Sequence, residues 1–440
     1  MLVTLTMCVM STLLALSRTT TPTTLMEFPP DCVYSQLRVS LNRSKSVHHK
    51  QGVPIPFCGS RQTKSVDVIY YANSKHHYPN DQKYILNGEF MTEIKEKVCS
   101  FGELYKAMHE CKKNVMWKTS VAGYVKNGLV NCYKLHNQLM DDTYKIDKYS
   151  YFTITEPKVR DIVSTRMKDR VFQRSLCDNY LYEKMTKGLI YDNAACQIGG
   201  GTDFSMDRLT RHMQKYFKEY GVEGYVLQCD IKGFFGNTRH SVAKDVVNKR
   251  VDDEWVKGHV FKVIESYGTK EHPNMGMGLG SQVTQLVQLA ILDDLDHYIK
   301  EELGIKLYSR YMDDFILVHH DKEYLKYCRA QIEKKLAVIH LRLNVKKTQL
   351  FPLRHGIKYL GFIFYITDTG KVIKKLQREN VTDQRKKLRK LKGLVDQGIL
   401  TKEHVNKIYE SWQSHAKKGN TYTLRRNMDQ YYKSLWITGG

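Results

Sequence analysis

Two adjacent aspartates, Asp313 and Asp314, stand at the edge of the apolar run 315–318 (FILV). Successive side chains of a regular strand point to opposite faces of the sheet, so this pair cannot serve one site from mid-strand. At the tip of a hairpin both can, because Asp adopts turn and left-handed conformations more readily than most residues. The pattern therefore predicts two short strands within 308–321 and a carboxylate pair on the turn between them.

A third acid, Asp230, follows the apolar segment 225–229 (YVLQC) and has the same setting, a hydrophobic strand that ends in a carboxylate. Carboxylates held together repel, and one would keep a proton near neutral pH unless a cation joined them. Mg²⁺ takes octahedral oxygen ligands, typically carboxylates together with substrate phosphates. Two such ions, for which Mn²⁺ could substitute, would activate an attacking 3′-hydroxyl and stabilise a leaving pyrophosphate. Taken singly, a strand-end Asp is usually a cap and an Asp pair is usually solvated, so only their joint occurrence supports this chemistry.

The charge balance favours a polyanionic partner. Across 440 residues, 69 Lys and Arg stand against 46 Asp and Glu, which gives a formal net charge of +23. Such an excess favours nucleic acid, with counterion release contributing to affinity, although solvated basic faces are the ordinary alternative. None of the ten cysteines forms a CxxC pair, which argues against zinc ribbons and for reduced thiols in a cytoplasmic protein.

The elements that must position the acids follow from the periodicity of apolar residues. Helical spacing occupies the segments 90–140, 165–220 (around the glycine-rich break 197–203), 280–303 and 324–341. Strand patterns occupy the segments 149–162, 224–235, 308–321 and 358–366. Strands and helices in this irregular order indicate an α+β fold whose antiparallel sheet carries the acids.

The segment YMDDF (311–315), with LQCDIKGFF (227–235) upstream, resembles the catalytic palm of bacterial- and phage-type reverse transcriptases. Further motifs follow in the order of that family. EPKVRDI (156–162) and MKDRVFQ (167–173) resemble its fingers, LGSQVTQLVQLAILDDLDHYIK (279–300) its palm helix, LRLNVKKTQL (341–350) its lysine motif and KYLGFIF (358–364) its primer-grip hairpin. The resemblance spans roughly 150–366 and implies a right-hand polymerase with fingers, palm and helical thumb.

The resemblance also implies roles for individual residues in the chemistry. Its catalytic and metal-binding set comprises Asp230, Ile231 through its backbone carbonyl, Asp313, Asp314 and Lys347. Lys347 would protonate the leaving pyrophosphate, and Lys346 is an equal neighbour for that role.

Substrate contacts are implied in the same way. The nucleotide-binding set comprises Lys158, Arg160, Phe235, Gly280 and Gln285, and the primer-grip turn comprises Leu360 and Gly361. Lys158 and Arg160 would clasp the triphosphate, Arg as a bidentate fork and Lys as a point charge. The ring of Phe235 would clash with a ribose 2′-hydroxyl and so favour deoxynucleotides.

One departure from the family pattern concerns the palm helix. Many of these enzymes have a Gln-Gly pair followed by Ser-Pro, where this chain has Leu279 and Gly280 followed by Thr284 and Gln285. Gln in place of Pro, and an apolar residue before the glycine, resemble the enzymes of diversity-generating retroelements and of some bacterial defence systems. The absence of a polar side chain at 279 predicts relaxed copying fidelity.

The resemblance and the composition together divide the chain into five parts. These are an apolar leader or mis-assigned translation start (1–26), an extension that is largely helical after residue 90 (27–148), fingers with part of the palm (149–223), palm (224–368) and helical thumb (369–440). The uncharged start is too short for a comfortable membrane span, so no membrane partner is expected.

The predicted function is that of an RNA-directed DNA polymerase in a prokaryotic retroelement. It would add dNTPs to the 3′ end of a DNA or RNA primer on a template RNA, and would hold the resulting RNA–DNA duplex. A structured non-coding RNA or an accessory protein is a further expected partner. Two alternatives stay open: an anti-phage defence enzyme that could act without a template, and a non-catalytic RNA-binding protein with a polymerase fold.

Overall fold

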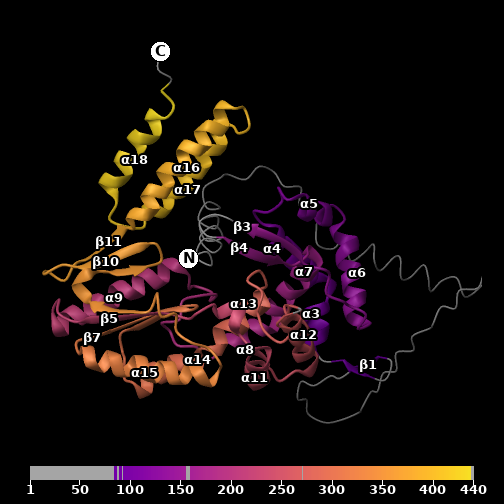
Figure 1. Cartoon of the computed structure of the whole chain (residues 1–440). Coiled ribbons are helices and arrows are strands. Elements are labelled where there is room, and N and C mark those ends of the chain that lie inside the picture. Colours follow the sequence, from indigo (N-terminus) through magenta and orange to yellow (C-terminus); the bar gives the residue numbers. More distant parts are fainter. Residues whose placement is uncertain (1–83, 87–88, 92, 155–158, 270, 438–440) are drawn as a thin grey trace, which may run out of the picture. The chain divides into compact units, whose positions relative to one another are not determined.

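The computed structural model describes residues 84–86, 89–91, 93–154, 159–269 and 271–437 (Figure 1). Contacts divide the chain into two compact units. The smaller, Leu14–Met91, contributes to the described part only the antiparallel pair β1 (Tyr84–Leu86) and β2 (Glu89–Met91). The predicted leader 1–26 lies outside the described residues. Within the described ranges, no helix combines the length and apolar character that a membrane span requires.

The larger unit begins with four helices, as the periodicity of 90–140 predicts. They are α3 (Glu93–Cys99), α4 (Phe101–Lys112), α5 (Thr119–Lys126) and α6 (Gly128–Met140). The side chain of Ser100 caps α4 by accepting from the backbone N–H of Glu103. Leu104 of α4 and Leu135 of α6 are buried in the same hydrophobic cluster as Phe172 of α7 (Met167–Leu176). This shared core joins the N-terminal helices to the segment that resembles the fingers.

A hairpin of β3 (Ser150–Ile154) and β4 (Arg160–Ser164) precedes α7. The sequence predicts a strand pattern over 149–162, and the structure divides this segment between two strands. Ile162 and Val163 account for the second strand, since β-branched residues favour extended backbone.

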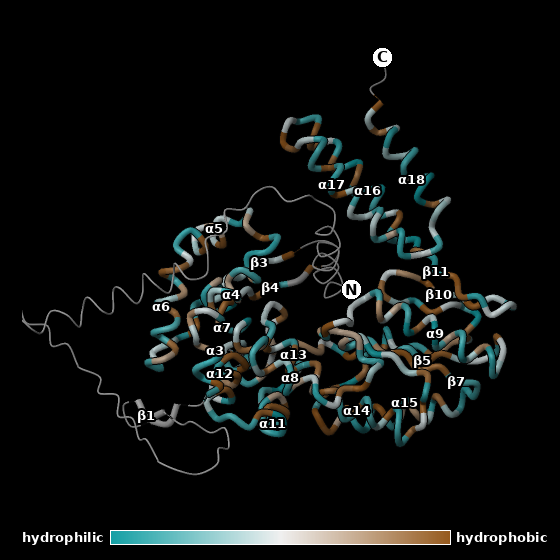
Figure 2. The backbone as a smooth tube through the Cα atoms, turned by 180° about the vertical axis from the view of Figure 1, so that it is seen from behind, coloured by the Kyte–Doolittle hydropathy of each residue, from teal (hydrophilic) through white to brown (hydrophobic). Residues whose placement is uncertain are grey.

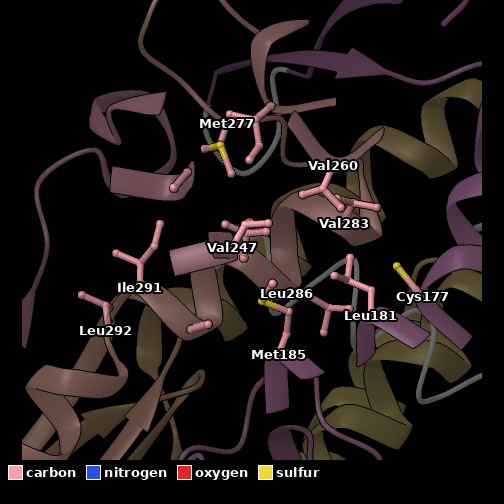
Figure 3. Close-up of a cluster of buried hydrophobic side chains, with 14 of the residues drawn as sticks. Cys177, Leu181, Met185, Val247, Val260, Met277, Val283, Leu286, Ile291 and Leu292 are labelled. Carbon is pink, nitrogen blue, oxygen red and sulfur yellow. The ribbon is translucent and has the colours of Figure 1, made fainter. Parts of the chain in front are cut away.

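Helices follow on either side of the glycine-rich segment. They are α7, the π-helical η3 (Cys177–Leu181), α8 (Tyr182–Thr186) and α9 (Thr202–Tyr220). Cys177, Leu181 and Met185 point into a buried cluster that also contains Val283 and Leu286 (Figure 3). The predicted helical character of 165–220 is thus confirmed.

An antiparallel sheet carries the acids. Its strand order is β6 (Tyr308–Tyr311), β7 (Asp314–His319), β5 (Tyr225–Asp230) and β8 (Gln349–Pro352). Leu227 and Leu317 are buried in one hydrophobic cluster with residues of α15 (Lys322–Val338), whereas Val226 and Val318 are buried in a second cluster with residues of α9. Because both faces are covered, β7 is an apolar run rather than an alternation of polar and apolar residues, and β5 and β7 are brown in Figure 2.

The predicted helix 280–303 is not continuous. It consists of α13 (Gln282–Ile291), α14 (Asp293–His297) and the π-helical η4 (Tyr298–Glu302), with the first break at Leu292. Three helices precede it in sequence: α10 (Phe234–Asn237), α11 (His240–Arg250) and α12 (Glu254–Glu265). On α14, Asp293 pairs with Arg250 of α11 and Asp296 pairs with Arg310 of β6.

The C-terminal part has a second sheet and three helices. The sheet contains β9 (Ile357–Tyr359), β10 (Phe362–Ile366) and β11 (Val372–Leu376), after the short 3₁₀ turn η5 (Leu353–His355). The helices are α16 (Arg378–Asp396), α17 (Lys402–Ala416) and α18 (Tyr422–Ser434). An apolar stripe of α16 packs inward: Leu388 is buried, with Leu391 and Val395 against the same cluster.

Candidate active site

The hairpin of β6 and β7 turns at Met312 and Asp313, with Tyr311 paired to Asp314 across it. Met312 has φ +56°, a left-handed value that tight hairpin turns require and usually obtain from glycine or asparagine. The sequence predicts both aspartates on the turn, whereas only Asp313 lies there beside Met312 and Asp314 is the first residue of β7. With Met312 turning the chain, both aspartates stay at the end of the sheet.

The three aspartates meet at that end. Asp314 is paired with Asp230 across β7 and β5, and the backbone N–H of Ile231 donates to the carbonyl of Asp313 over 3.3 Å. Burial, with the charges of Asp313 and Asp230, raises the pKa of Asp314 to about 7. Burial and the charge of Asp230 also raise the pKa of Asp313. The carboxylates therefore concentrate more negative charge than their surroundings stabilise, which favours a bound cation.

Lys347 is the lysine that reaches the acids. Its Nζ donates to Oδ1 of Asp230 over 2.5 Å, while Nδ2 of Asn344 donates to Oδ2 over 3.1 Å. Burial disfavours the ammonium form, but the bond to Asp230 holds the pKa of Lys347 above its ordinary value. Lys346 is exposed, and its backbone N–H donates to the side-chain oxygen of Asn344. Sequence reasoning missed Asn344, for which the only signal was a polar residue within the lysine motif.

Divalent cations fit this donor set. Among the described residues, no three His, Cys, Asp or Glu side chains form a ready-made cage for a metal ion. Mg²⁺ sites of enzymes that act on nucleotides are commonly completed by substrate phosphates, so Asp230, Asp313 and Asp314 suit a cation that arrives with a triphosphate. When bound, such ions would supply charge stabilisation at the attacking and leaving oxygens.

Phe235 lies in the short helix that follows Asp230. The backbone reverses at Gly233, which has φ +57°, and the ring of Phe235 then packs edge-on against Phe234 with centroids 5.7 Å apart. The carbonyl of Phe235 accepts from the N–H of Met277 over 2.7 Å. The half-buried ring contacts both hydrophobic clusters. These contacts hold it in one position, as a steric gate requires.

Gly280 and Gln285 belong to the start of α13. Ser281 caps the helix by accepting from the N–H of Thr284 over 3.3 Å. The side-chain amide of Gln285 donates to the carbonyl of Leu279 over 2.9 Å. A Cβ on Gly280 would lie 3.1 Å from the carbonyl oxygen of Val163, so this exposed glycine packs closely on the backbone of β4.

The turn between β9 and β10 is the predicted primer-grip hairpin. Its two residues, Leu360 and Gly361, have φ +48° and +89°, the pair of left-handed values that a type I′ turn requires. A Cβ on Gly361 would lie 3.3 Å from Nε2 of His415 in α17. The turn is therefore both tight and in contact with the C-terminal helices.

The two predicted triphosphate contacts are described only in part. Lys158 lies outside the described residues. Arg160 begins β4, where its backbone pairs with Ile154 of β3.

An antiparallel sheet that brings three acids to the ends of two neighbouring strands, with helices on both faces, defines the palm of a right-hand polymerase, an α+β fold. Residues 158–364 match the family model of reverse transcriptase (RNA-dependent DNA polymerase). This segment, just under half of the chain, thus matches a reverse transcriptase domain, whose enzyme class is RNA-directed DNA polymerase, a nucleotidyltransferase. Domains of this class use divalent metal ions and act on template RNA and a primer.

A search among curated proteins for related sequences gives no match. Among solved structures, the chain is similar to apo telomerase from Candida tropicalis truncated from its C-terminal domain, with 14% identity and a TM-score of 0.40 over 52% of this chain and 55% of that chain. It is also similar to the apo telomerase of the same organism, with 12% identity and a TM-score of 0.39 over 52% of this chain and 48% of that chain. The chain spans about half the length of these telomerases.

Proposed function

We propose that the chain is an RNA-directed DNA polymerase that adds deoxynucleotides to a primer 3′ end, with two Mg²⁺ ions held by Asp230, Asp313 and Asp314. The observation that carries the proposal is the meeting of these carboxylates at the ends of β5 and β7, inside the matched reverse transcriptase segment. Lys347, bonded to Asp230, is then placed to protonate the leaving pyrophosphate.

Substrate selection falls to residues around this centre. The fixed ring of Phe235 excludes a ribose 2′-hydroxyl, and the contact of the Leu360–Gly361 turn with α17 seats the primer end. Further nucleotide contacts come from Lys158, Arg160, Gly280 and Gln285. The backbone carbonyl of Ile231 assists the aspartates in holding the metal.

The biological setting we propose is a prokaryotic retroelement, with diversity-generating retroelements as the first type to test. Gln285 and Leu279 support it, since this pair resembles those enzymes and predicts relaxed fidelity. The enzyme would work in the cytoplasm on a template RNA, with a structured non-coding RNA or an accessory protein as further partners. The same two residues also suit an anti-phage defence enzyme, which is the second candidate.

Primer extension tests the proposal. Wild type, Asp313→Asn and Asp321→Asn are compared with dNTPs or rNTPs, with and without an RNA template. Asp321 is the matched control, because it lies at the other end of β7, is exposed and only caps α15, a role that Asn fills equally well. Template-dependent DNA synthesis is expected in wild type and Asp321→Asn, with a loss of at least about a hundredfold in Asp313→Asn, equivalent to about 2.7 kcal/mol.

Three other outcomes would contradict the proposal or favour one of the alternative functions. Incorporation that survives Asp313→Asn refutes the assigned site. Synthesis that needs no template supports the defence enzyme, and RNA binding without any incorporation supports the non-catalytic alternative.

A further inference from the structure

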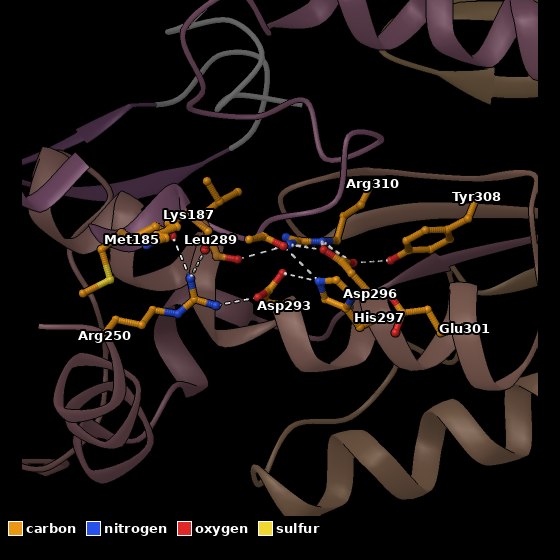
Figure 4. A network of polar contacts seen from close by, with 11 residues as sticks. Met185, Lys187, Arg250, Leu289, Asp293, Asp296, His297, Glu301, Tyr308 and Arg310 are labelled. Carbon is orange, nitrogen blue, oxygen red and sulfur yellow. Dashed lines mark hydrogen bonds and ion pairs between the residues drawn. The ribbon is translucent and has the colours of Figure 1, made fainter. Parts of the chain in front are cut away.

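Arg310 is a fully buried arginine three residues before the first acid of the catalytic turn (Figure 4). Its guanidinium forms a fork on Asp296 of α14, with Nε 2.7 Å from Oδ1 and Nη2 2.6 Å from Oδ2. The hydroxyl of Tyr308 donates to the same carboxylate over 2.6 Å. The side chains of Arg310 and Asp296 have no exposed surface, so the two groups are held in one position and neither charge contacts solvent.

The remaining donors of Arg310 hold backbone carbonyls. Nη1 donates to the carbonyl of Met312 over 3.0 Å, and Nη2 donates to the carbonyl of Leu289 over 3.1 Å. Met312 is the left-handed residue of the hairpin, and its carbonyl belongs to the peptide plane that leads into Asp313. A non-glycine residue keeps a left-handed conformation only where its surroundings hold it. The bond from Arg310 is such a restraint, applied directly before the acids.

The backbone of Arg310 is anchored as firmly as its side chain. Its N–H donates to the carbonyl of Asp192 over 3.0 Å, and its carbonyl accepts from the N–H of Ala194 over 3.2 Å. The carboxylate of Asp192 is itself bonded to Arg208 and Lys300. The guanidinium therefore reaches Met312 from a point that is held on two sides.

We propose that Arg310 is a positioning residue for the polymerase reaction. Its fork on Asp296 fixes the guanidinium, and the guanidinium fixes the peptide between Met312 and Asp313, which sets where Asp313 and Asp314 lie. This inference rests on the proposed function of the same site. It goes beyond that function, because the side chains of Arg310 and Asp296 are fully buried and would act through the backbone of the turn.

Arginine is required for this role because of its shape. A planar guanidinium can face one carboxylate with two donors and two carbonyls with the others, whereas an ammonium is a point charge with no fixed plane. Arg310→Lys therefore keeps the buried charge and the pairing with Asp296 but removes the defined geometry toward Met312.

The chain contains a second arginine–aspartate pair that serves as a control, and its aspartate, Asp293, lies on the same helix, α14, as Asp296. Arg250 donates to Oδ2 of Asp293 over 2.5 Å and also to two backbone carbonyls, those of Met185 at 3.2 Å and Lys187 at 3.0 Å (Figure 4). This second arginine also joins a carboxylate of α14 to two backbone carbonyls, but it is partly exposed and reaches Asp293 through one nitrogen. Its carbonyls belong to α8 and the residue after it rather than to the catalytic turn. Arg250→Lys therefore reports the loss of an arginine that links α14 to a neighbouring backbone, without effect on Asp313.

The experiment compares Arg310→Lys, Arg250→Lys and wild type in three measurements. These are the thermal midpoint, single-nucleotide kcat and KM on an RNA template, and Mn²⁺ binding followed by electron paramagnetic resonance. We expect both variants to lose thermal stability, and Arg310→Lys to lose more because its ion pair is fully buried. Only Arg310→Lys should lower kcat, by tenfold or more at a KM within threefold of wild type, and weaken Mn²⁺ binding several-fold.

Equal effects of the two variants on kcat and on Mn²⁺ binding would show a purely structural ion pair and overturn the proposal. If Arg310→Lys yields too little folded protein, Asp296→Asn is compared with Asp293→Asn under the same criteria. The Mn²⁺ measurement needs no turnover, so wild type that binds Mn²⁺ but makes no DNA refutes the proposed function while the positioning role is still decided.

Discussion

Two buried groups, His259 and Asp169, give the core of the N-terminal helices opposite responses to pH. The ring of His259 lies between Trp255 and Phe172, with centroids 4.4 and 5.1 Å away, and burial lowers its pKa to about 4. Asp169 accepts a hydrogen bond from Tyr144 over 2.7 Å, and burial raises its pKa to about 6. Both belong to elements that pack in one cluster, so both act on the stability of the same region.

Whether each group stabilises or destabilises the fold as the pH changes follows from comparing its pKa in the folded protein with its ordinary value in the unfolded chain. The pKa of His259 falls from 6.5 to about 4, so its contribution to stability is complete above pH 6.5 and is lost as the pH falls toward 4. The loss is about 3 kcal/mol, since one pKa unit corresponds to about 1.4 kcal/mol. The pKa of Asp169 rises from 3.8 to about 6, so its ionisation costs stability above pH 6, and a similar free energy is regained as the pH falls to 3.8. The two effects nearly cancel between pH 6 and 4.

A single substitution at either position should reveal the pH dependence that the other group gives to the free energy of unfolding. In His259→Phe only the aspartate titrates, so the free energy of unfolding should rise by about 3 kcal/mol from pH 7 to pH 4 relative to wild type. In Asp169→Asn only the histidine titrates, and the free energy should fall by about the same amount. The assay is urea unfolding followed by the fluorescence of Trp255, after Phe replaces the other tryptophans, Trp117, Trp412 and Trp436. Parallel pH profiles for wild type and both variants would refute the assignment.

Further predictions concern the site itself. Phe235→Ala should raise rNTP incorporation relative to dNTP incorporation by at least about tenfold, about 1.4 kcal/mol, in single-nucleotide kinetics. An unchanged ratio would refute the role of Phe235 as a steric gate. Lys347→Met should lower kcat by about a hundredfold, in the range of general acid catalysis, while Lys346→Met stays within threefold of wild type; equal losses would leave neither lysine as the proton donor. Gln285→Ala should change the error rate on a defined RNA template more than Leu279→Gln does, because the Gln285 side chain holds the carbonyl of Leu279. A larger effect of Leu279→Gln would contradict this role of Gln285.

Local pattern was enough to predict the sheet that carries the acids. An apolar run that ends in an acid specifies where a buried strand stops, which is why the extent of β5, the hairpin of β6 and β7 and the turn at Gly361 could all be predicted. Lys347 could be placed only as one of two neighbours, because sequence spacing does not show which of two adjacent side chains faces the site.

Features that depend on distant contacts were not predictable. The break at Leu292 has no glycine or proline to mark it, and it stands next to Asp293 and Asp296, which pair with arginines on α11 and β6. Arg310 was missed for the same reason. A charged residue in a buried strand has no local signal of function, because its partners come from segments far away in the sequence.

The departure in the palm helix also has a different meaning once the backbone is known. Gln285 donates its backbone N–H to the carbonyl of Ser281 over 3.2 Å, a bond that proline at this position could not make. Its side chain donates to the carbonyl of Leu279 over 2.9 Å. The apolar residue at 279 and the glutamine at 285 thus meet in one hydrogen bond, and the loop before Gly280 is held by a flexible side chain instead of a rigid ring. Any effect of this pair on fidelity should therefore act through the position of that loop, rather than through the apolar character of the Leu279 side chain.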